Sequence, residues 1–211
     1  RIKPASVFLT EKCLNVQHLH VRLGEQYILK DLSFSSRGGE IIAIVGANGA
    51  GKTTLMRLLC NIQNPTSGKI LLNGKNAVGL GERYRSLLGY LPQHFGYYPD
   101  FSAFDFLLYV SALKGLDEKA ARKKSKELLE AVDLSKESKH KIKTFSGGMK
   151  QRLGIGLALV GEPDLLVLDE PINGLDPQGI AEIRDMLLRL KEEQNMPIII
   201  SSHILEELSK I

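Results

Sequence analysis

The chain has 211 residues, 43% of them hydrophobic and 25% charged, and a net charge of +4. These are the proportions of an ordinary globular protein, and they exclude collagen-like repeats, disulfide scaffolds and extended disorder. Cys13 and Cys60 are too few and too far apart for a metal knuckle or a redox pair, so we expect reduced thiols. No apolar run approaches the roughly 18 residues that span a bilayer, and no signal peptide opens the chain. The mild positive charge suits anionic ligands without requiring nucleic acid.

Short runs of branched apolar residues alternate with helical patterns, which predicts an α/β protein built on a largely parallel sheet. Residues 14–23 and 27–34 are typical of half-exposed strands joined by a turn at Gly24-Glu25, and they predict an antiparallel β edge region. Three further apolar runs predict buried strands. They are residues 41–45, 165–168 and 198–200.

Residues 46–53 fit the phosphate-binding pattern G-x-x-x-x-G-K-[ST], directly after a predicted strand and before the amphipathic run 54–59. The glycines let successive backbone N–H groups point at a phosphate, and the following helix adds the positive end of its dipole. Lys52 is expected to reach the β- and γ-phosphates and Thr53 to ligate Mg²⁺. A glycine-rich turn without a ligand is the alternative, which the flanking strand and helix disfavour. The predicted phosphate-binding residues are Gly46, Ala47, Asn48, Gly49, Ala50, Gly51, Lys52, Thr53 and Thr54.

Two adjacent carboxylates, Asp169 and Glu170, follow the apolar run 165–168. Adjacent side chains at a strand end point in different directions. We therefore expect Asp169 to hold Mg²⁺ through water while Glu170 faces a nucleophilic water. The alternative is a pair of solvated acids that open the loop before Pro171, and the four preceding apolar residues disfavour it.

Between residues 101 and 143 the sequence shows helical patterns and no convincing strand. Apolar residues recur at helical spacing from Phe104 to Leu113, and a Lys/Glu-rich amphipathic segment with Leu128 and Val132 on one side follows. We predict an α-helical insertion into the α/β core. Its lysines are interleaved with acids, which favours a solvated helix face over a nucleic-acid patch.

Residues 146–152, Ser-Gly-Gly-Met-Lys-Gln-Arg, lie shortly before the paired carboxylates and resemble the signature motif of ATP-binding-cassette (ABC) ATPases. Other landmarks of this family follow the expected order, and the resemblance extends from residue 14 to residue 208. Gln93 resembles the Q-loop glutamine, Gly174-Leu175-Asp176-Pro177 the D-loop, and His203 the switch histidine. Alone, Gln93 and His203 would be ordinary loop or surface residues. His203 follows the predicted strand at residues 198–200, and Gln93 follows Tyr90-Leu91-Pro92 and leads into the helical insertion, positions that favour nucleotide contacts.

The resemblance implies a P-loop NTPase fold with a RecA-like core. We assign residues 1–92 and 147–211 to that core and residues 93–146 to an inserted helical subdomain. Ser146 is a good N-cap, and the glycines after it leave a bare helix N-terminus that can receive an anion. In the family this receptor grips the γ-phosphate bound to a second subunit, in a head-to-tail dimer. The expected residues acting in trans are Ser146, Gly147, Gly148 and Met149, with Asp176 in the D-loop.

The resemblance also gives each landmark a role in ATP hydrolysis with Mg²⁺. Glu170 is the general base on water, Lys52 neutralises phosphate charge, and His203 positions the attacking water. Gln93 contacts the metal or its water and senses the γ-phosphate. The expected metal ligands are Thr53, Gln93 and, through water, Asp169.

The chain departs from the family pattern at the adenine contact. Family members stack the base on an aromatic residue just before the glycine of the first turn, and aligning Gly24 places Leu23 there. An aliphatic side chain packs on a purine without the aromatic stacking of about 1 kcal/mol. Tyr27 is the other candidate contact, or else a strand residue. Smaller departures are Phe145, Met149 and Ile172.

We therefore predict the ATP-binding subunit of a transporter, similar to drug and antibiotic exporters and bound peripherally at the cytoplasmic face of the membrane. Its expected partners are a second ABC subunit, identical or different, and a membrane-spanning subunit contacted by the helical insertion, with no direct nucleic acid. The alternative is a soluble ABC-type ATPase acting on nucleic acid or the ribosome. The chain begins with Arg1 rather than Met, so we expect it to be part of a longer protein with further elements after Ile211.

Overall fold

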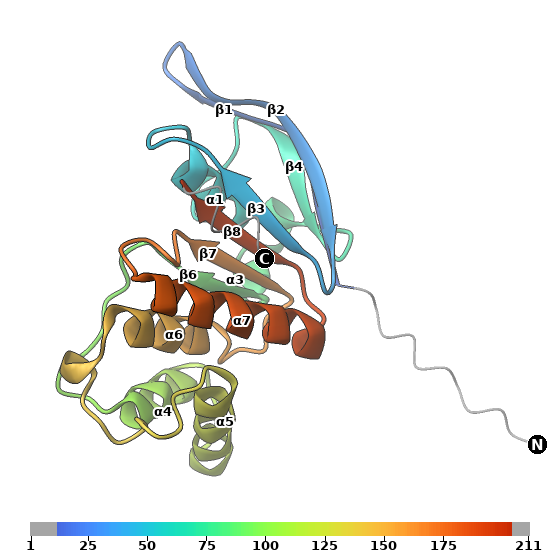
Figure 1. Cartoon of the computed structure of the whole chain (residues 1–211). Coiled ribbons are helices and arrows are strands. Elements are labelled where there is room, and N and C mark those ends of the chain that lie inside the picture. Colours follow the sequence, from blue (N-terminus) through green and yellow to red (C-terminus); the bar gives the residue numbers. More distant parts are fainter. Residues whose placement is uncertain (1–11, 204–211) are drawn as a thin grey trace, which may run out of the picture.

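The computed structural model describes residues 12–203, which form two four-stranded sheets with helices around them (Figure 1). The first sheet has the strand order β2-β1-β4-β5 and is antiparallel throughout. A turn at Gly24-Glu25 joins its two long strands, which confirms the predicted antiparallel edge region. Its strands are β1 (Cys13–Leu23), β2 (Gln26–Arg37), β4 (Ser67–Leu72) and β5 (Lys75–Asn76).

The second sheet is parallel and has the order β3-β8-β7-β6. Its strands are β3 (Ile41–Val45), β6 (Leu88–Leu91), β7 (Leu165–Asp169) and β8 (Ile198–Ser202). Every residue of β7 and β8 is buried, as predicted for residues 165–168 and 198–200. The predicted strand at residues 41–45 is confirmed as β3, but its predicted burial is wrong, because β3 lies at the edge of the sheet and Val45 is 40% exposed. The short strand β6 was not predicted.

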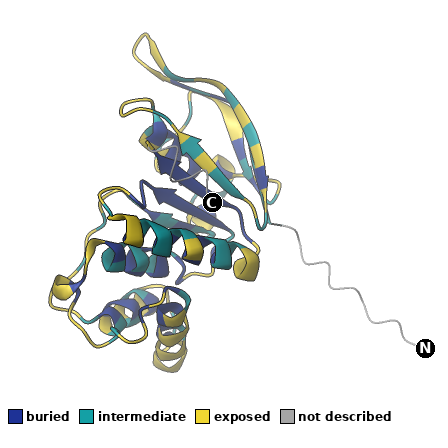
Figure 2. Ribbon diagram, in the orientation of Figure 1, coloured by how far each residue is buried: buried dark blue, intermediate teal, exposed yellow. Residues whose placement is uncertain are grey.

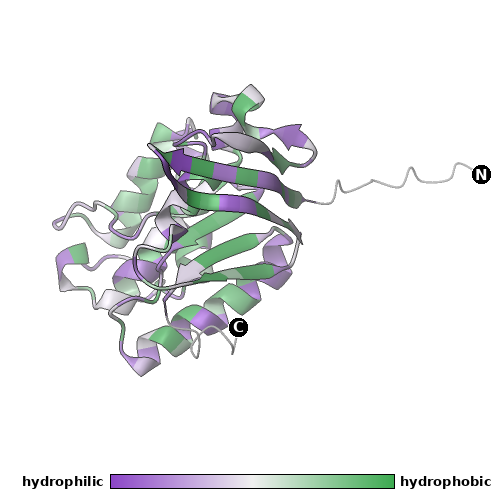
Figure 3. Cartoon of the chain, turned by 90° about the horizontal axis from the view of Figure 1, so that it is seen from above, coloured by the Kyte–Doolittle hydropathy of each residue, from purple (hydrophilic) through white to green (hydrophobic). Residues whose placement is uncertain are grey.

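Alternate residues of the central strands face two different cores, because side chains alternate across a strand. Leu166, Leu168, Ile198 and Ile200 pack with α6 (Gly147–Ala158) and α7 (Pro177–Gln194). Leu165, Val167 and Ile199 pack instead with the antiparallel sheet and with α1 (Lys52–Leu59). Figure 2 shows the buried strands β7 and β8 between the helices and the antiparallel sheet. Figure 3 shows that these central strands are apolar, whereas hydrophilic and hydrophobic residues alternate along the hairpin of β1 and β2.

The segment between residues 103 and 144 is helical, as predicted, with α4 (Ala103–Leu113), α5 (Glu118–Ala131) and a short 3-10 helix, η1 (Ile142–Thr144). Ser102 and Asp117 cap α4 and α5 by accepting hydrogen bonds from backbone N–H groups. Leu107, Leu128 and Val132 pack into the same core as α6. The insertion therefore lies beside α6, the helix that begins within the predicted signature motif (Figure 1).

The remaining helices are the short α2 (Ala77–Leu80) and α3 (Glu82–Ser86), which precede β6. No helix within residues 12–203 is long and apolar enough to cross a membrane. The predicted core boundaries include residues 1–11 and 204–211, which lie outside the described residues, as does the C-terminal end of the family resemblance.

Candidate active site

The glycine-rich loop runs from the end of β3 into α1, as predicted. Gly51 is the N-cap of α1 and has φ = 92°, a conformation that side-chain-bearing residues rarely adopt. A Cβ atom at this position would also lie 3.2 Å from Ile28 Cγ2. Gly49, with φ = 82°, is the second left-handed glycine of the loop. The loop thus needs glycine at these two positions to turn tightly into the helix.

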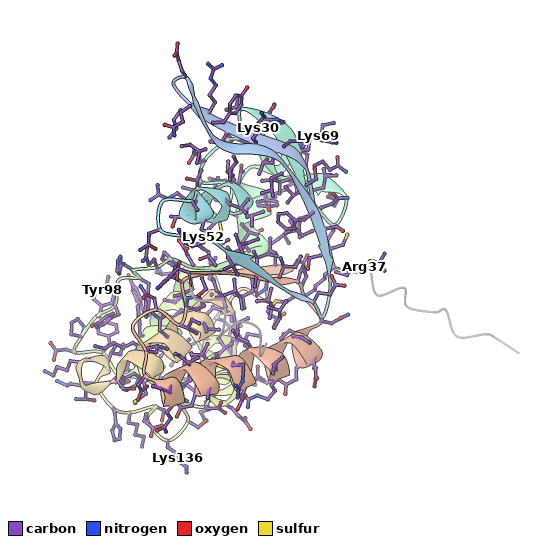
Figure 4. The ribbon with its side chains drawn as sticks, turned by 45° about the horizontal axis from the view of Figure 1, so that its top comes forward. Lys30, Arg37, Lys52, Lys69, Tyr98 and Lys136 are labelled. Carbon is purple, nitrogen blue, oxygen red and sulfur yellow. The ribbon has the colours of Figure 1, made fainter. Side chains whose placement is uncertain are left out.

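Lys52 is the first residue of α1, and its side chain folds back into the loop (Figure 4). The Nζ atom donates to the backbone oxygens of Gly46, at 2.6 Å, and Ala47, at 3.1 Å. The same atom lies 3.4 Å from Glu170 Oε1. With only 8% of the residue exposed, this ammonium group is held where a phosphate entering the loop would meet it.

The paired carboxylates at the end of β7 point in different directions and are both buried. Glu170 carries the Lys52 ion pair on one oxygen, and its Oε2 accepts from His203 Nδ1 at 2.9 Å. Asp169 Oδ1 accepts from Ser201 Oγ at 2.6 Å. The fold therefore brings three predicted catalytic residues, Lys52, Glu170 and His203, into one network of side-chain contacts.

A cavity of about 480 Å³ lies in front of this network. Most of its wall consists of residues that the sequence predicts for nucleotide binding. Those residues are Asn48, Gly49, Gly51, Lys52, Thr53, Thr54, Gln93, Glu170 and His203. Gly46 and Ala47 lie behind them as hydrogen-bond acceptors of Lys52, and Ala50 N donates to Ala47 O at 3.1 Å.

Three neighbouring residues escaped the sequence analysis as parts of the site. Ile28 and Asn173 line the cavity, and Ser201 Oγ donates to the Asp169 carboxylate and accepts from the backbone N–H of Glu170. Leu23 and Tyr27, the predicted adenine contacts, are 60% and 49% exposed on the hairpin and do not line this cavity. The alternating pattern of β2 did not identify Ile28, because the close approach of Gly51 to that strand follows only from the fold.

One oxygen at the site is left for a cation. Asp169 Oδ2 is buried without a hydrogen-bond partner within residues 12–203, although buried polar atoms normally have one. Thr53 and Gln93 supply a hydroxyl and an amide oxygen to the nearby cavity. These are the hard oxygen ligands that Mg²⁺ prefers, and one carboxylate with few other protein ligands is its usual arrangement beside phosphates. The donor set therefore fits the predicted metal.

The predicted signature motif lies around a second cavity of about 480 Å³. Ser146 caps α6, where its Oγ accepts from Met149 N at 3.2 Å. Asp176 caps α7 in the same way, accepting from Gly179 N at 3.0 Å. The wall includes Ser146, Gly147, Gly148, Gly174, Leu175 and Asp176, and the two cavities share no residue. Within residues 12–203, the wall of the cavity at Lys52 therefore includes no residue of the signature motif.

The chain is similar to known proteins over most of its length. The family model described as ABC transporter matches residues 29–173. The bacitracin transport ATP-binding protein BcrA of Enterococcus faecalis is 37% identical over 205 residues, which are 97% of this chain and 66% of that protein. The lantibiotic transport ATP-binding protein SrtF of Streptococcus pyogenes is 38% identical over 198 residues, covering 94% of this chain and 83% of that protein.

Solved structures show the same fold. The structure of cbiO1 from Clostridium perfringens, part of the ABC transporter complex cbiONQ, superposes with a TM-score of 0.81 at 30% identity. The match covers 90% of this chain and 78% of that one. Among curated relatives, the chain spans 65% of the length of YxlF, an ABC transporter ATP-binding protein of Bacillus subtilis, and 66% of BcrA from Enterococcus faecalis.

Proposed function

The chain belongs to the ABC transporter family, and from this premise we propose that it binds and hydrolyses ATP to power a membrane-spanning partner. The single observation that carries the proposal is the network of Lys52, Glu170 and His203 at the glycine-rich loop. An ammonium group, a buried carboxylate and an imidazole meet there at the wall of one cavity. Phosphoryl transfer consists mainly of positioning and charge stabilisation, and these groups supply both.

The reaction assigns one step to each group. When ATP binds, Lys52 exchanges its ion pair with Glu170 for one with the phosphates. The backbone N–H groups of the loop and the N-terminus of α1 bind the remaining phosphate oxygens. The freed Glu170 carboxylate takes a proton from water, whose oxygen bonds to the γ-phosphorus as the bond to the β-phosphate oxygen breaks. His203 orients that water, and ADP and phosphate leave. Mg²⁺, when bound by Thr53, Gln93 and, through water, Asp169, neutralises charge on the β- and γ-phosphates.

We propose that a second ABC subunit completes the site. Two observations support this: the N-terminus of α6 at Ser146 and Gly148 can receive an anion, and among residues 12–203 the wall of its cavity includes no residue of the phosphate loop. A head-to-tail dimer places this receptor over the nucleotide of the partner. Hydrolysis then depends on dimer closure, which is the mechanical output.

The helical insertion is the proposed contact with the membrane-spanning subunit. An apolar cavity of about 420 Å³, lined by Leu91, Phe95, Phe106 and Val110 among others, opens between the insertion and the core. The insertion also carries exposed aromatic side chains, among them Tyr98 (Figure 4), whose ring contacts that of the exposed Tyr109. The names of BcrA and SrtF connect those relatives with bacitracin and lantibiotic transport. We propose by this likeness an exporter subunit, located peripherally at the cytoplasmic face of the membrane.

The test compares phosphate release from Mg²⁺–ATP by the wild-type protein and Glu170→Gln. We expect turnover to fall about 100-fold or more, because loss of a general base typically costs this much. ATP binding is retained, so the variant accumulates as a dimer in light scattering. Glu162→Gln is the matched control, since Glu162 pairs with Lys124 at the surface. Turnover of Glu170→Gln within about twofold of wild type would remove Glu170 as the base.

A further inference from the structure

Ser201 is a neighbour of both acidic residues and has no exposed surface. It belongs to β8, in parallel register with Asp169 at the end of β7. Its Oγ atom is 2.6 Å from Asp169 Oδ1 and 2.9 Å from Glu170 N. One hydroxyl group therefore contacts both of the acidic residues of the proposed site.

The chemistry of the donors fixes the direction of both hydrogen bonds. A backbone N–H group can only donate, so Ser201 Oγ accepts from Glu170. A serine hydroxyl has one hydrogen, and the ionised carboxylate of Asp169 can only accept it. Asp169 Oδ1 is thus occupied by the serine, and its buried Oδ2 has no partner within residues 12–203. Ser201 fixes which oxygen of Asp169 is left for a ligand.

The second hydrogen bond acts on the backbone of Glu170. This residue has φ = 52°, which is uncommon for any residue other than glycine. Such a conformation persists only where the surroundings hold it, and it occurs often at active sites. The bond from Glu170 N to Ser201 Oγ is one such restraint. With its backbone in this conformation, Glu170 turns its carboxylate toward Lys52 and His203 at the cavity wall.

We propose that Ser201 is a positioning residue of the ATPase site, which presents Asp169 Oδ2 to hydrated Mg²⁺ and holds the backbone of Glu170 in its left-handed conformation. This inference rests on the proposed function. It assigns Ser201 a role through Asp169 and Glu170, without contact to the nucleotide. The partners of metal-binding carboxylates commonly tune metal affinity in this way.

The experiment measures metal binding rather than turnover. Ser201→Thr and Ser201→Val have the same shape and differ only in the hydroxyl group, and both β-branched residues suit a strand. Free Mn²⁺ is followed by electron paramagnetic resonance during titration into protein saturated with a non-hydrolysable ATP analogue. Relative to wild type, we expect about tenfold weaker Mn²⁺ binding by Ser201→Val and a change within about twofold for Ser201→Thr. Affinity for the analogue without metal stays unchanged in both variants.

Ser125→Ala is the control for loss of a buried serine hydroxyl, because Ser125 Oγ donates to Ala121 O within α5 and contacts no residue of the proposed site. We expect it to bind Mn²⁺ as the wild type does. Equal Mn²⁺ affinities for Ser201→Val and Ser201→Thr would overturn the proposal and leave Ser201 a packing residue. Failure of the wild type to bind the analogue at all would overturn the proposed function itself, and this inference with it.

Discussion

Replacing Lys52 and Glu170, separately and together, measures the coupling free energy of the ion pair between them. The Lys52 Nζ and Glu170 Oε1 atoms are 3.4 Å apart, and the two side chains are 8% and 7% exposed. Coulomb's law at an effective dielectric constant of about 20 gives an attraction of about 5 kcal/mol at this separation. Desolvation of both groups offsets most of it, and hydrogen bonds to charged groups usually contribute about 1.5–3 kcal/mol.

We therefore expect a coupling free energy of about 2 kcal/mol from the double-mutant cycle of Lys52→Met, Glu170→Gln and the double variant. The assay is urea unfolding of the nucleotide-free protein at neutral pH. Lys52→Met is expected to be the more destabilising single change, because it leaves the Glu170 carboxylate buried with His203 as its remaining side-chain partner among residues 12–203. A coupling free energy below about 0.5 kcal/mol would refute the argument that the site stores this pair for exchange with phosphate.

Three further predictions concern packing, the cavity wall and pH. Gly89→Ala places a methyl group against a backbone carbonyl of α6, so we expect the free energy of unfolding in urea to fall by about 2 kcal/mol. An unchanged unfolding midpoint would contradict this prediction. Ile28→Ala removes part of the cavity wall and should weaken ATP binding in calorimetry about fivefold, or about 1 kcal/mol. Leu23→Ala should leave ATP binding unchanged, because Leu23 is exposed and does not line the cavity. Equal effects of the two substitutions would contradict this prediction. The hydrogen bond from Lys124 lowers the pKa of Glu162, so Glu162→Gln should lower the free energy of unfolding by about 0.5 kcal/mol above pH 4.5. In urea unfolding, this difference from wild type should vanish as pH falls through the lowered pKa. A difference that grows in acid would contradict the prediction.

Local patterns were sufficient to predict much of the site. The strand, glycine-rich loop and helix around Lys52 are contiguous in the chain, and the carboxylates of Asp169 and Glu170 directly follow a run of buried residues. The resemblance to ABC ATPases added Gln93 and His203, which the fold places at the wall of the same cavity as Lys52.

Contacts between distant strands could not be predicted. The apolar composition of β3 does not reveal that it is an edge strand, because strand order is a property of the whole sheet. The role of Ser201 depends on its register with Asp169, and that of Ile28 on the close approach of Gly51. Leu23 comes from aligning Gly24 and Tyr27 is its possible substitute; neither is in the wall of the cavity at Lys52, and their contact with adenine stays a prediction.

The central claim is that the nucleotide site is shared between two subunits, and mixing two inactive variants tests it most directly. Lys52→Ala disables the phosphate loop, and Gly148→Asp places a carboxylate in the anion receptor at the N-terminus of α6 while remaining compatible with the helix dipole. Each variant alone should fail to hydrolyse ATP. In an equal mixture, half of the randomly exchanged dimers hold one intact site, so we predict about a quarter of wild-type turnover. A mixture no more active than its two components would contradict the shared site.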